Sequence, residues 1–253
     1  MDAEERRRSI LEATRRAGSV DVARTAADLG ISKETVRRDL NLLAAHELVR
    51  RTHGGAYPVE SAGFETTLSY RTTSQVREKS RIAAAAVGLL GDAKTVYIDE
   101  GYTPQLIAAG LPRDRPLTVI TSSLAAAGTL ASVENITVLL LGGRVRGATL
   151  ATVDHWVTHT LSDLVIDLAY VGANGISRQW GLTTPNPAVS DVKTQVMAVS
   201  RRRVFSGVHN KFGAASFCRF AGIGDLEAIV TDTGLPAAEA RRYVLLGPQV
   251  IRV

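Results

Sequence analysis

The stretch LGISKETVRRDLNLLAAHELVRRTHGGA, residues 29–56, decides the fold of the N-terminal part of the chain. Ser32 follows a glycine-containing turn and can accept hydrogen bonds from the first backbone N–H groups of a helix. Val36, Leu40 and Leu43 then repeat at spacings of four and three, which is typical of a buried helical stripe. We therefore predict a capped helix that buries this stripe.

The helix carries two adjacent arginines, and they cannot do the same job because successive residues are rotated by about 100°. With Val36 at the centre of the buried face, Arg38 points almost directly away from it and Arg37 lies on one flank. A helix fits the major groove of DNA and presents side chains to base edges. We predict that Arg38 faces the groove, that Arg37 meets phosphate or an intramolecular acid, and that Asp39, on the other flank, pairs with another residue.

Further helices are predicted on the N-terminal side, from about Glu4 to Ala17 and from about Val22 to Leu29. On the C-terminal side, LVRRT favours a strand, and the following His-Gly-Gly supplies a turn in which glycine allows positive φ. Residues 1–57 thus predict a winged helix-turn-helix domain. The alternative is a helical protein-interaction module with a solvated charged face.

Residues 29–56 also resemble the N-terminal signature of the DeoR family of bacterial transcriptional regulators. That signature has Ser, Thr, paired Arg and Asp in this order, followed by an Arg-x-His-Gly-Gly-Ala wing. The resemblance implies a DNA-binding set: Ser32, Lys33, Thr35, Arg37, Arg38, His53 and Gly54.

The rest of the chain predicts a second domain of a different class. Residues 58–74 have little apolar periodicity and are predicted to be a linker. Residues 75–253 alternate short apolar runs (TVYID, LTVIT, ITVLLLGG, DLAYVGANG, RRVFSGVH, LEAIVTD) with helical patterns. This alternation indicates a Rossmann-like α/β domain with a mostly parallel sheet, which we predict binds an effector and forms oligomers.

Several of these strands end in small polar or glycine-rich turns, where open α/β sheets bind ligands. Thr103 is predicted to cap a helix with Pro104 at its first position, leaving N–H groups that attract an anion. Arg144, Lys193 and Lys211 add positive charge. Each turn alone is equally typical of an ordinary strand-to-helix connection. Together they favour an anion pocket.

Residues 78–232 resemble the DeoR-family sensor, which has the fold of ribose-phosphate isomerases. The resemblance implies binding of a phosphorylated sugar. The family loop Asp-Ser-Gly-Thr-Thr is replaced here by a loop containing Glu100 and Tyr102, and Ser122 stands where Asn is common, so a non-phosphorylated sugar derivative remains an alternative. The predicted effector-binding residues are Asp99, Gly101, Tyr102, Thr103, Thr121, Ser122, Ser123, Gly142, Gly143, Arg144, Asn174, Lys193 and Lys211.

Isomerases of this fold supply a proton-transferring carboxylate from an Asp-Gly-x-Asp-Glu loop. The matching stretch, Gly172-Ala173-Asn174-Gly175, contains no carboxylate. We therefore predict a regulator that is not an enzyme. The alternatives are a sugar-phosphate isomerase-like enzyme with a fused DNA-binding domain, or a regulator whose sensor has lost its ligand and serves only for oligomerisation.

Composition agrees with a two-domain chain: 253 residues with 45% hydrophobic content and a net charge of +5. The charge is spread evenly, since residues 1–57 hold 11 basic and 9 acidic side chains. Cys218 is the only cysteine, and His155 and His159 have no third ligand nearby, so no metal or cofactor is predicted. The N-terminus contains no signal-peptide-like apolar block, which predicts a cytoplasmic protein without membrane contact.

These features combine into one functional prediction: a repressor of sugar-metabolism genes. Its partners would be double-stranded operator DNA and a phosphorylated sugar or related derivative. Because one DNA-binding head makes a small interface, we also expect a homodimer or homotetramer.

Overall fold

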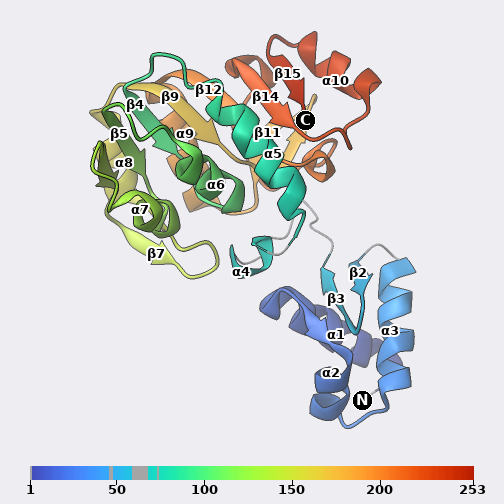
Figure 1. Ribbon diagram of the computed structural model, residues 1–253. Coiled ribbons are helices and arrows are strands. Elements are labelled where there is room, and N and C mark those ends of the chain that lie inside the picture. The colour runs from blue at the N-terminus through green and yellow to red at the C-terminus, as the bar shows by residue number, and fades with distance from the viewer. Residues whose placement is uncertain (1, 46–47, 59–67, 73) are drawn as a thin grey trace.

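The computed structural model describes residues 2–45, 48–58, 68–72 and 74–253. It contains a small N-terminal domain and a larger α/β domain (Figure 1). The N-terminal domain is built from α1 (Ala3–Ala17), β1 (Val20–Asp21), α2 (Val22–Leu29), α3 (Lys33–Ala45), β2 (Val49–Thr52) and β3 (Gly55–Pro58). The three helices and the wing hairpin, β2 and β3, follow the predicted order, and β1 was not predicted.

Each helix of this domain begins at a side-chain cap. Asp2 caps α1 and forms a capping box with Glu5, and Asp21 caps α2. Ser32 accepts a hydrogen bond of 3.0 Å from the N–H of Thr35, as the sequence predicts. α2 ends at Gly30, whose φ of +64° is a left-handed conformation suited to glycine.

The wing is a hairpin whose two-residue turn, His53-Gly54, joins Thr52 to Gly55. Gly54 has a φ of +92°, so this turn requires glycine. β1 pairs with β3 on the other side, giving the order β1-β3-β2. A Cβ at Gly55 would lie 2.1 Å from the carbonyl oxygen of Val20, so a glycine is also required where these strands meet.

The larger domain is organised around a seven-stranded parallel sheet in the order β15-β14-β12-β9-β4-β5-β6. Its strands are β4 (Thr95–Ile98), β5 (Leu117–Thr121), β6 (Ile136–Leu140), β9 (Ile166–Val171), β12 (Ser200–Ser206), β14 (Ala228–Thr231) and β15 (Gln249–Arg252). The first six coincide with the predicted apolar runs, and β15 was not predicted. The predicted fold class is confirmed.

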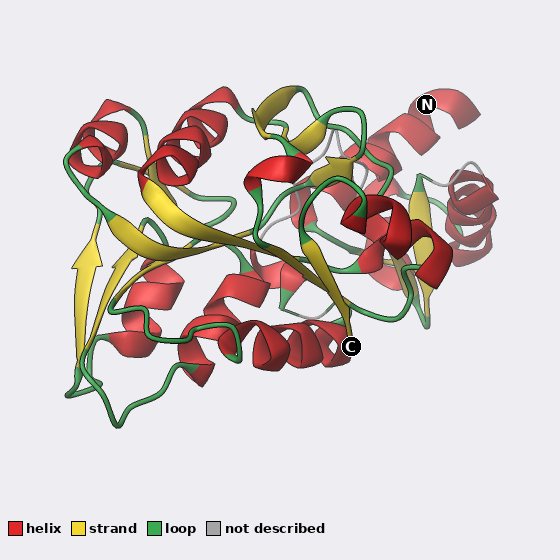
Figure 2. Ribbon diagram, turned by 90° about the horizontal axis from the view of Figure 1, so that it is seen from above, coloured by secondary structure: helices red, strands yellow, loops and turns green. Residues whose placement is uncertain are grey.

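Helices cover both faces of this sheet, as Figure 2 shows. The helices are α5 (Val76–Val87), α6 (Tyr102–Gly110), α7 (Leu124–Leu130), α8 (His155–Ser162), α9 (Pro187–Val199) and α10 (Ala237–Val244). Alternate residues of β4 face opposite sides of the sheet. Val96 and Ile98 pack with α5, α6 and α7, whereas Tyr97 packs with α8, α9 and α10. The result is a three-layer sandwich.

Short antiparallel strands, which the sequence did not predict, decorate the ends of the sheet. β7 (Arg144–Arg146) pairs with β8 (Ala151–Val153), and β11 (Gly181–Thr184) pairs with β10 (Gly175–Ser177) and β13 (Cys218–Ala221). Two single-turn helices, η1 (His209–Lys211) and η2 (Ile223–Asp225), complete the domain.

The predicted linker, residues 58–74, falls largely on residues 59–67 and 73, which lie outside the described part of the chain. Within its described part, Leu68–Arg71 form a short helix, α4, and Pro58 ends β3. The domain boundaries at residues 57 and 74 stay predictions. In the part that the structure describes, no helix is long and apolar enough to cross a bilayer.

Candidate nucleic-acid interface and ligand pocket

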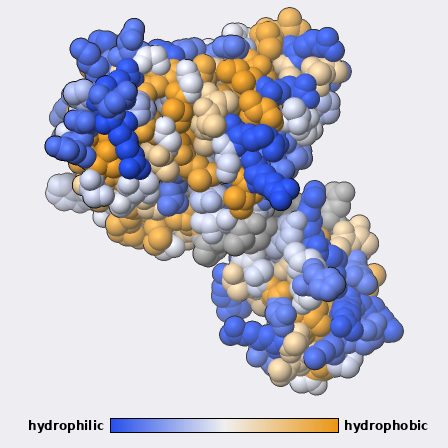
Figure 3. Space-filling model, viewed as in Figure 1, coloured by the Kyte–Doolittle hydropathy of each residue, from blue (hydrophilic) through white to orange (hydrophobic). Residues whose placement is uncertain are grey.

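The recognition helix, α3, has the side-chain distribution that its sequence predicts. Val36 and Leu40 are fully buried and Leu43 is nearly so, and they pack on α1 and α2 through Ile10, Val22 and Ala26. Arg37 and Arg38 are exposed. The guanidinium of Arg37 lies 3.4 Å from Glu34, the intramolecular acid on its flank. In Figure 3, hydrophilic residues cover most of the outer side of this domain, where α3 lies.

Asp39 pairs with Arg6 of α1, which is the other partner expected for this carboxylate. The two side chains form a forked pair, with distances of 2.6 Å from Nε to Oδ2 and 3.2 Å from a terminal guanidinium nitrogen to Oδ1. Asp39 is only 2% exposed, and the hydrogen bond to it raises the pKa of Arg6. Because the pair is bidentate, it fixes the rotation of α3 relative to α1.

Of the remaining predicted DNA-binding residues, Thr35 is half-buried and the others are exposed. Ser32 and Lys33 stand at the start of α3, and the Ser32 hydroxyl is 2.9 Å from that of Thr35. His53 and Gly54 form the exposed tip of the wing. The domain therefore presents a helix start and a hairpin tip, the two parts with which winged helices meet DNA.

In the α/β domain, a pocket opens where the strand order reverses, between β4 and β9. From β4 the chain moves outward to β5 and β6, and it then returns to place β9 on the opposite side of β4. Open α/β sheets bind ligands at such a point, beyond the carboxyl ends of the strands. The pocket and the open solvent at its mouth together hold about 500 Å³ of empty space. Its lining residues are Arg71, Lys79, Glu100, Gly101, Tyr102, Thr103, Pro104, Gly172, Ala173, Asn174, Lys193, Ser206 and Lys211.

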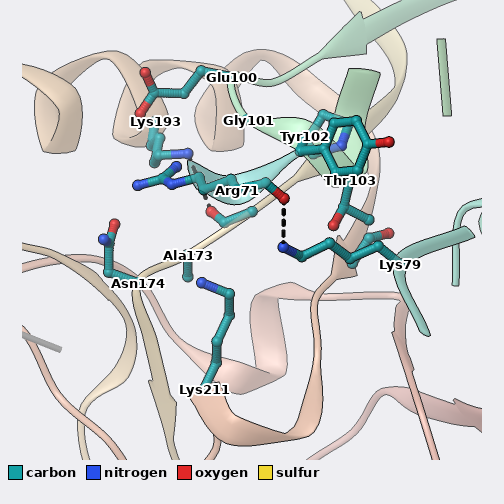
Figure 4. A pocket seen from close by; sticks show the side chains of 13 residues that line it. Arg71, Lys79, Glu100, Gly101, Tyr102, Thr103, Ala173, Asn174, Lys193 and Lys211 are labelled. Atoms are coloured by element: carbon teal, nitrogen blue, oxygen red, sulfur yellow. Dashed lines mark hydrogen bonds between the residues drawn. The ribbon is translucent and has the colours of Figure 1, made fainter. Parts of the chain in front are cut away.

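The lining of this pocket carries more positive than negative charge. Of the described residues that line it, four are basic (Arg71, Lys79, Lys193 and Lys211) and Glu100 alone is acidic. Figure 4 shows the basic side chains converging on one space. α6 begins at the pocket with Gly101 as its N-cap, and the first N–H groups of a helix have no acceptor within it. Basic side chains and free N–H groups together suit an anion.

The expectation that Thr103 caps this helix is wrong. α6 begins at Tyr102, Gly101 occupies the cap position with a φ of +112°, and no side chain caps the helix. Thr103 lies within the first turn and is 7% exposed. A glycine cap leaves room for a ligand at the helix start, which a side-chain cap would occupy.

Lys193 is held by Asp99 at the back of the pocket. Its ammonium group forms a buried ion pair with the Asp99 carboxylate and donates a second hydrogen bond, of 3.1 Å, to the carbonyl of Gly172. Asp99 also accepts a hydrogen bond of 2.8 Å from the Gly172 N–H. These contacts tie the ends of β4 and β9 together, so the predicted ligand residues Asp99 and Lys193 are also structural.

Thr121, Ser122 and Ser123 are buried behind the pocket rather than lining it. Thr121 donates to the carbonyl of Ile98, and Ser123 caps α7. The Ser122 hydroxyl lies 3.2 Å from that of Tyr97, whose pKa is raised, first by burial and then by the Asp99 charge. Their hydroxyls therefore make structural hydrogen bonds behind the pocket.

Gly142, Gly143 and Arg144 lie in a different place. They line a shallow hollow with Asp154 and α8, and Arg144 forms an ion pair of 2.7 Å with Asp154. The structure thus brings together Gly101, Tyr102, Thr103, Asn174, Lys193 and Lys211 in one pocket, and it separates the Gly142–Arg144 turn from them.

Comparisons with known proteins agree with this two-domain arrangement. Residues 6–62 match a DeoR-like helix-turn-helix domain, and residues 74–233 match a DeoR C-terminal sensor domain. The chain belongs to the DeoR family. It is a DNA-binding transcriptional regulator with a sensor domain.

Similar proteins include the transcriptional regulator GlpR of Haloferax volcanii, which is 32% identical over 98% of this chain and 96% of that protein. The glycerol-3-phosphate regulon repressor of Escherichia coli K12 is 28% identical over 94% of both chains. Among solved structures, ribose 5-phosphate isomerase A of Methanocaldococcus jannaschii is 18% identical over 55% of both chains, with a TM-score of 0.39. Because this similarity covers only about half of each chain, no function is inferred from it.

Within this DeoR-family chain, the pocket contains residues that were not predicted, above all Arg71 and Lys79. Lys79 is 6% exposed and precedes Ile82, Ala83 and Ala86 on the buried face of α5. A lysine in phase with an apolar stripe is a signal that could have identified it. Arg71 had no such signal, because its segment shows no periodicity.

The loop that holds Lys211 is braced by a neighbouring pair, His209 and Asp232. The Asp232 carboxylate lies 2.6 Å from the imidazole of His209 and accepts its backbone N–H at 2.7 Å. Burial alone would raise the pKa of Asp232, but the hydrogen bonds from His209 and Gly234 keep that pKa below its usual value. Among the described residues, no group of three or more His, Cys, Asp or Glu side chains could hold a metal.

Proposed function

We propose that this DeoR-family regulator is a repressor of sugar or polyol metabolism, and that an anionic sugar derivative in the sensor pocket modulates its DNA binding. The observation that carries the proposal is the convergence of four basic side chains on the amino end of α6, where the strand order reverses. A ligand can change DNA affinity only through its different affinity for the two states of the protein, typically by 1–3 kcal/mol.

The chemistry of the pocket favours a small ligand with both an anionic group and hydroxyls. The α6 start and the basic side chains suit phosphate or carboxylate, and Glu100 and Asn174 offer polar partners for hydroxyl groups. A relative is named for the glycerol-3-phosphate regulon. We therefore assign the effector to phosphorylated sugars and polyols, with Lys211, Tyr102, Thr103 and Gly101 around the anionic group.

Lys211→Met should weaken binding of sn-glycerol 3-phosphate or fructose 1-phosphate by at least about tenfold, because a hydrogen bond to a charged group contributes about 1.5–3 kcal/mol. Isothermal titration calorimetry on the full-length protein measures this. Lys94→Met is the matched control, since Lys94 is exposed at the amino end of β4, the opposite end of the sheet. Unchanged binding in Lys211→Met would contradict the assignment.

At the other end of the chain, we assign DNA contacts to Ser32, Lys33, Thr35, Arg37, Arg38, His53 and Gly54. Arg38 projects from the exposed face of α3 and reads a base edge, and Arg37, on the flank with Glu34, meets a phosphate. Two heads are needed for a specific interface of ordinary size, so the proposal includes a homodimer or a larger homo-oligomer. Sedimentation velocity measures that state, and a monomer bound to its operator would contradict it.

Arg38→Ala should remove about 1–3 kcal/mol of discrimination at one base pair, because a good bidentate contact to a base contributes that much. Arg37→Ala should instead weaken binding to all DNA sequences equally. It should also reduce the slope of log binding constant against log salt concentration by about one. Gel-shift titrations over a salt series, with an operator selected in vitro and a scrambled duplex, separate the two. If both variants behave alike, this division of roles is wrong.

A further inference from the structure

The short helix α4 (Leu68–Arg71) belongs to neither matched region, since it lies between residue 62 and residue 74. It is nevertheless part of the ligand pocket, because Arg71 lines the pocket beside Lys79 and Lys211 (Figure 4). A four-residue helix is too short to be stable alone, so its contacts with the sensor domain hold it in place.

The carboxyl end of α4 is held by a pocket lysine. The Lys79 ammonium group donates hydrogen bonds of 2.9 Å to the carbonyl of Arg71 and 2.7 Å to the carbonyl of Ser74. The same group lies 5.9 Å from the ring centre of Tyr102, at the start of α6. A ligand that contacts Lys79 or Tyr102 therefore touches the support of α4.

The amino end of α4 is attached to another segment that reaches the pocket. The N–H of Leu68 donates a hydrogen bond of 2.8 Å to the carbonyl of Ala148, in the turn between β7 and β8. On that same hairpin, Arg146 lies 3.8 Å from the carboxylate of Glu100, and both side chains are nearly buried. Glu100 lines the pocket, so the amino end of α4 is connected to the ligand site through the β7–β8 hairpin, and Arg71 at its carboxyl end lines the site itself.

Arg71 itself reaches the place where an anion would sit. A Cβ added to Gly101 would lie 3.6 Å from a guanidinium nitrogen of Arg71, which puts the guanidinium over the amino end of α6. A planar guanidinium and helix N–H groups that face one space are complementary to a phosphate or carboxylate.

We infer that Arg71 is an effector-binding residue, and that α4 transmits occupancy of the pocket to the DNA-binding domain. The anionic group of the effector bridges Arg71 to the start of α6 and thereby fixes α4. Pro58 ends β3 and Leu68 begins α4, and because a chain spans at most about 3.5 Å per residue, the two lie within roughly 35 Å of each other. Fixing α4 thus fixes the point from which each DNA-binding domain is tethered. This inference rests on the proposed function of the pocket.

The test uses full-length protein with two probes, sn-glycerol 3-phosphate and inorganic phosphate. Calorimetry measures affinity, and hydrogen exchange with mass spectrometry measures protection of the amides of residues 68–72. In the wild type, either probe should slow exchange in this segment. Arg71→Gln should weaken both probes by at least about tenfold and abolish the protection even at saturation.

Two further variants separate the outcomes. Lys211→Met should also weaken binding, but at saturating probe it should retain protection of residues 68–72, because Arg71 is intact. Arg77→Gln, at an exposed arginine on α5, should behave as the wild type. Equal melting temperatures establish that all variants fold.

If Arg71→Gln binds both probes as the wild type does while Lys211→Met does not, the inference about Arg71 is wrong and the pocket assignment stands. If Arg71→Gln loses affinity but its residues 68–72 are still protected at saturation, transmission through α4 is wrong. If the wild type binds neither probe, the proposed function fails, and this inference fails with it.

Discussion

Lys193→Met should lower the free energy of unfolding of the sensor domain by about 3–5 kcal/mol, because it leaves the Asp99 carboxylate buried without its partner. Both side chains are almost inaccessible: they are 4% and 2% exposed. The ion pair also organises Gly172, whose carbonyl accepts from Lys193 and whose N–H donates to Asp99. Loss of the lysine therefore removes one of the contacts that join the ends of β4 and β9, where the pocket forms.

Urea unfolding followed by circular dichroism measures this loss, with hydrogen exchange in β4 and β9 assigning the transition to the sensor. The matched control is the double variant Lys193→Met with Asp99→Asn. It removes both charges, and its amide still accepts from Gly172, so it should recover much of the lost stability. A single variant within about 1 kcal/mol of the wild type would show that the pair is not a structural element.

Leu40→Ala should destabilise the N-terminal domain by about 2–5 kcal/mol and abolish operator binding. Leu40 is fully buried in the stripe that attaches α3 to α1 and α2. A domain this small buries limited apolar surface, so a cavity of this size removes a large share of its stability. The sensor domain should be unaffected, and its effector affinity is the internal check.

Leu42 supplies the control, because it lies two residues further along α3 and is 41% exposed. Leu42→Ala makes the same chemical change outside the core and should cost less than about 0.5 kcal/mol. Hydrogen exchange of the α3 amides distinguishes the two variants. Equal protection of α3 in both would mean that burial of Leu40 does not hold the recognition helix.

The N-terminal domain could be predicted from sequence because its determinants are local. The spacing of Val36, Leu40 and Leu43 defines the buried face, and Ser32 and Gly30 define the helix ends, all within one short stretch. The side on which Arg38 lies follows from that stripe. The partner of Asp39 could be expected only in general terms, because Arg6 is 33 residues away along the chain.

The pocket was less predictable because its residues converge from distant segments. From the sequence, Lys193 is predicted to be available to a ligand. Its partner Asp99 lies 94 residues away along the chain, and the two meet only because β4 and β9 are neighbours in the sheet. Arg144 follows a strand end as the pocket residues do, but its hairpin turns it toward Asp154. The turn residues in the sequence show where strands end, but they do not show which strand ends line the same pocket.

α4 illustrates the other limit. The segment around Leu68–Arg71 has no repeated apolar spacing, so its sequence is indistinguishable from a linker. Its helical turn is held by the carbonyl of Ala148, which is distant in sequence, and by the side chain of Lys79 on α5. Tertiary contacts alone make it a structural element.

The pair between Arg6 and Asp39 bears on how DNA specificity can be exchanged between regulators of this family. A recognition helix transplanted from a relative would keep its base-reading pose here only if it also brings a carboxylate at position 39 to meet Arg6. A graft that lacks this acid would leave Arg6 without its partner and let the new helix rotate about its axis. Where the donor helix has no acid at this position, α1 must therefore be exchanged together with α3.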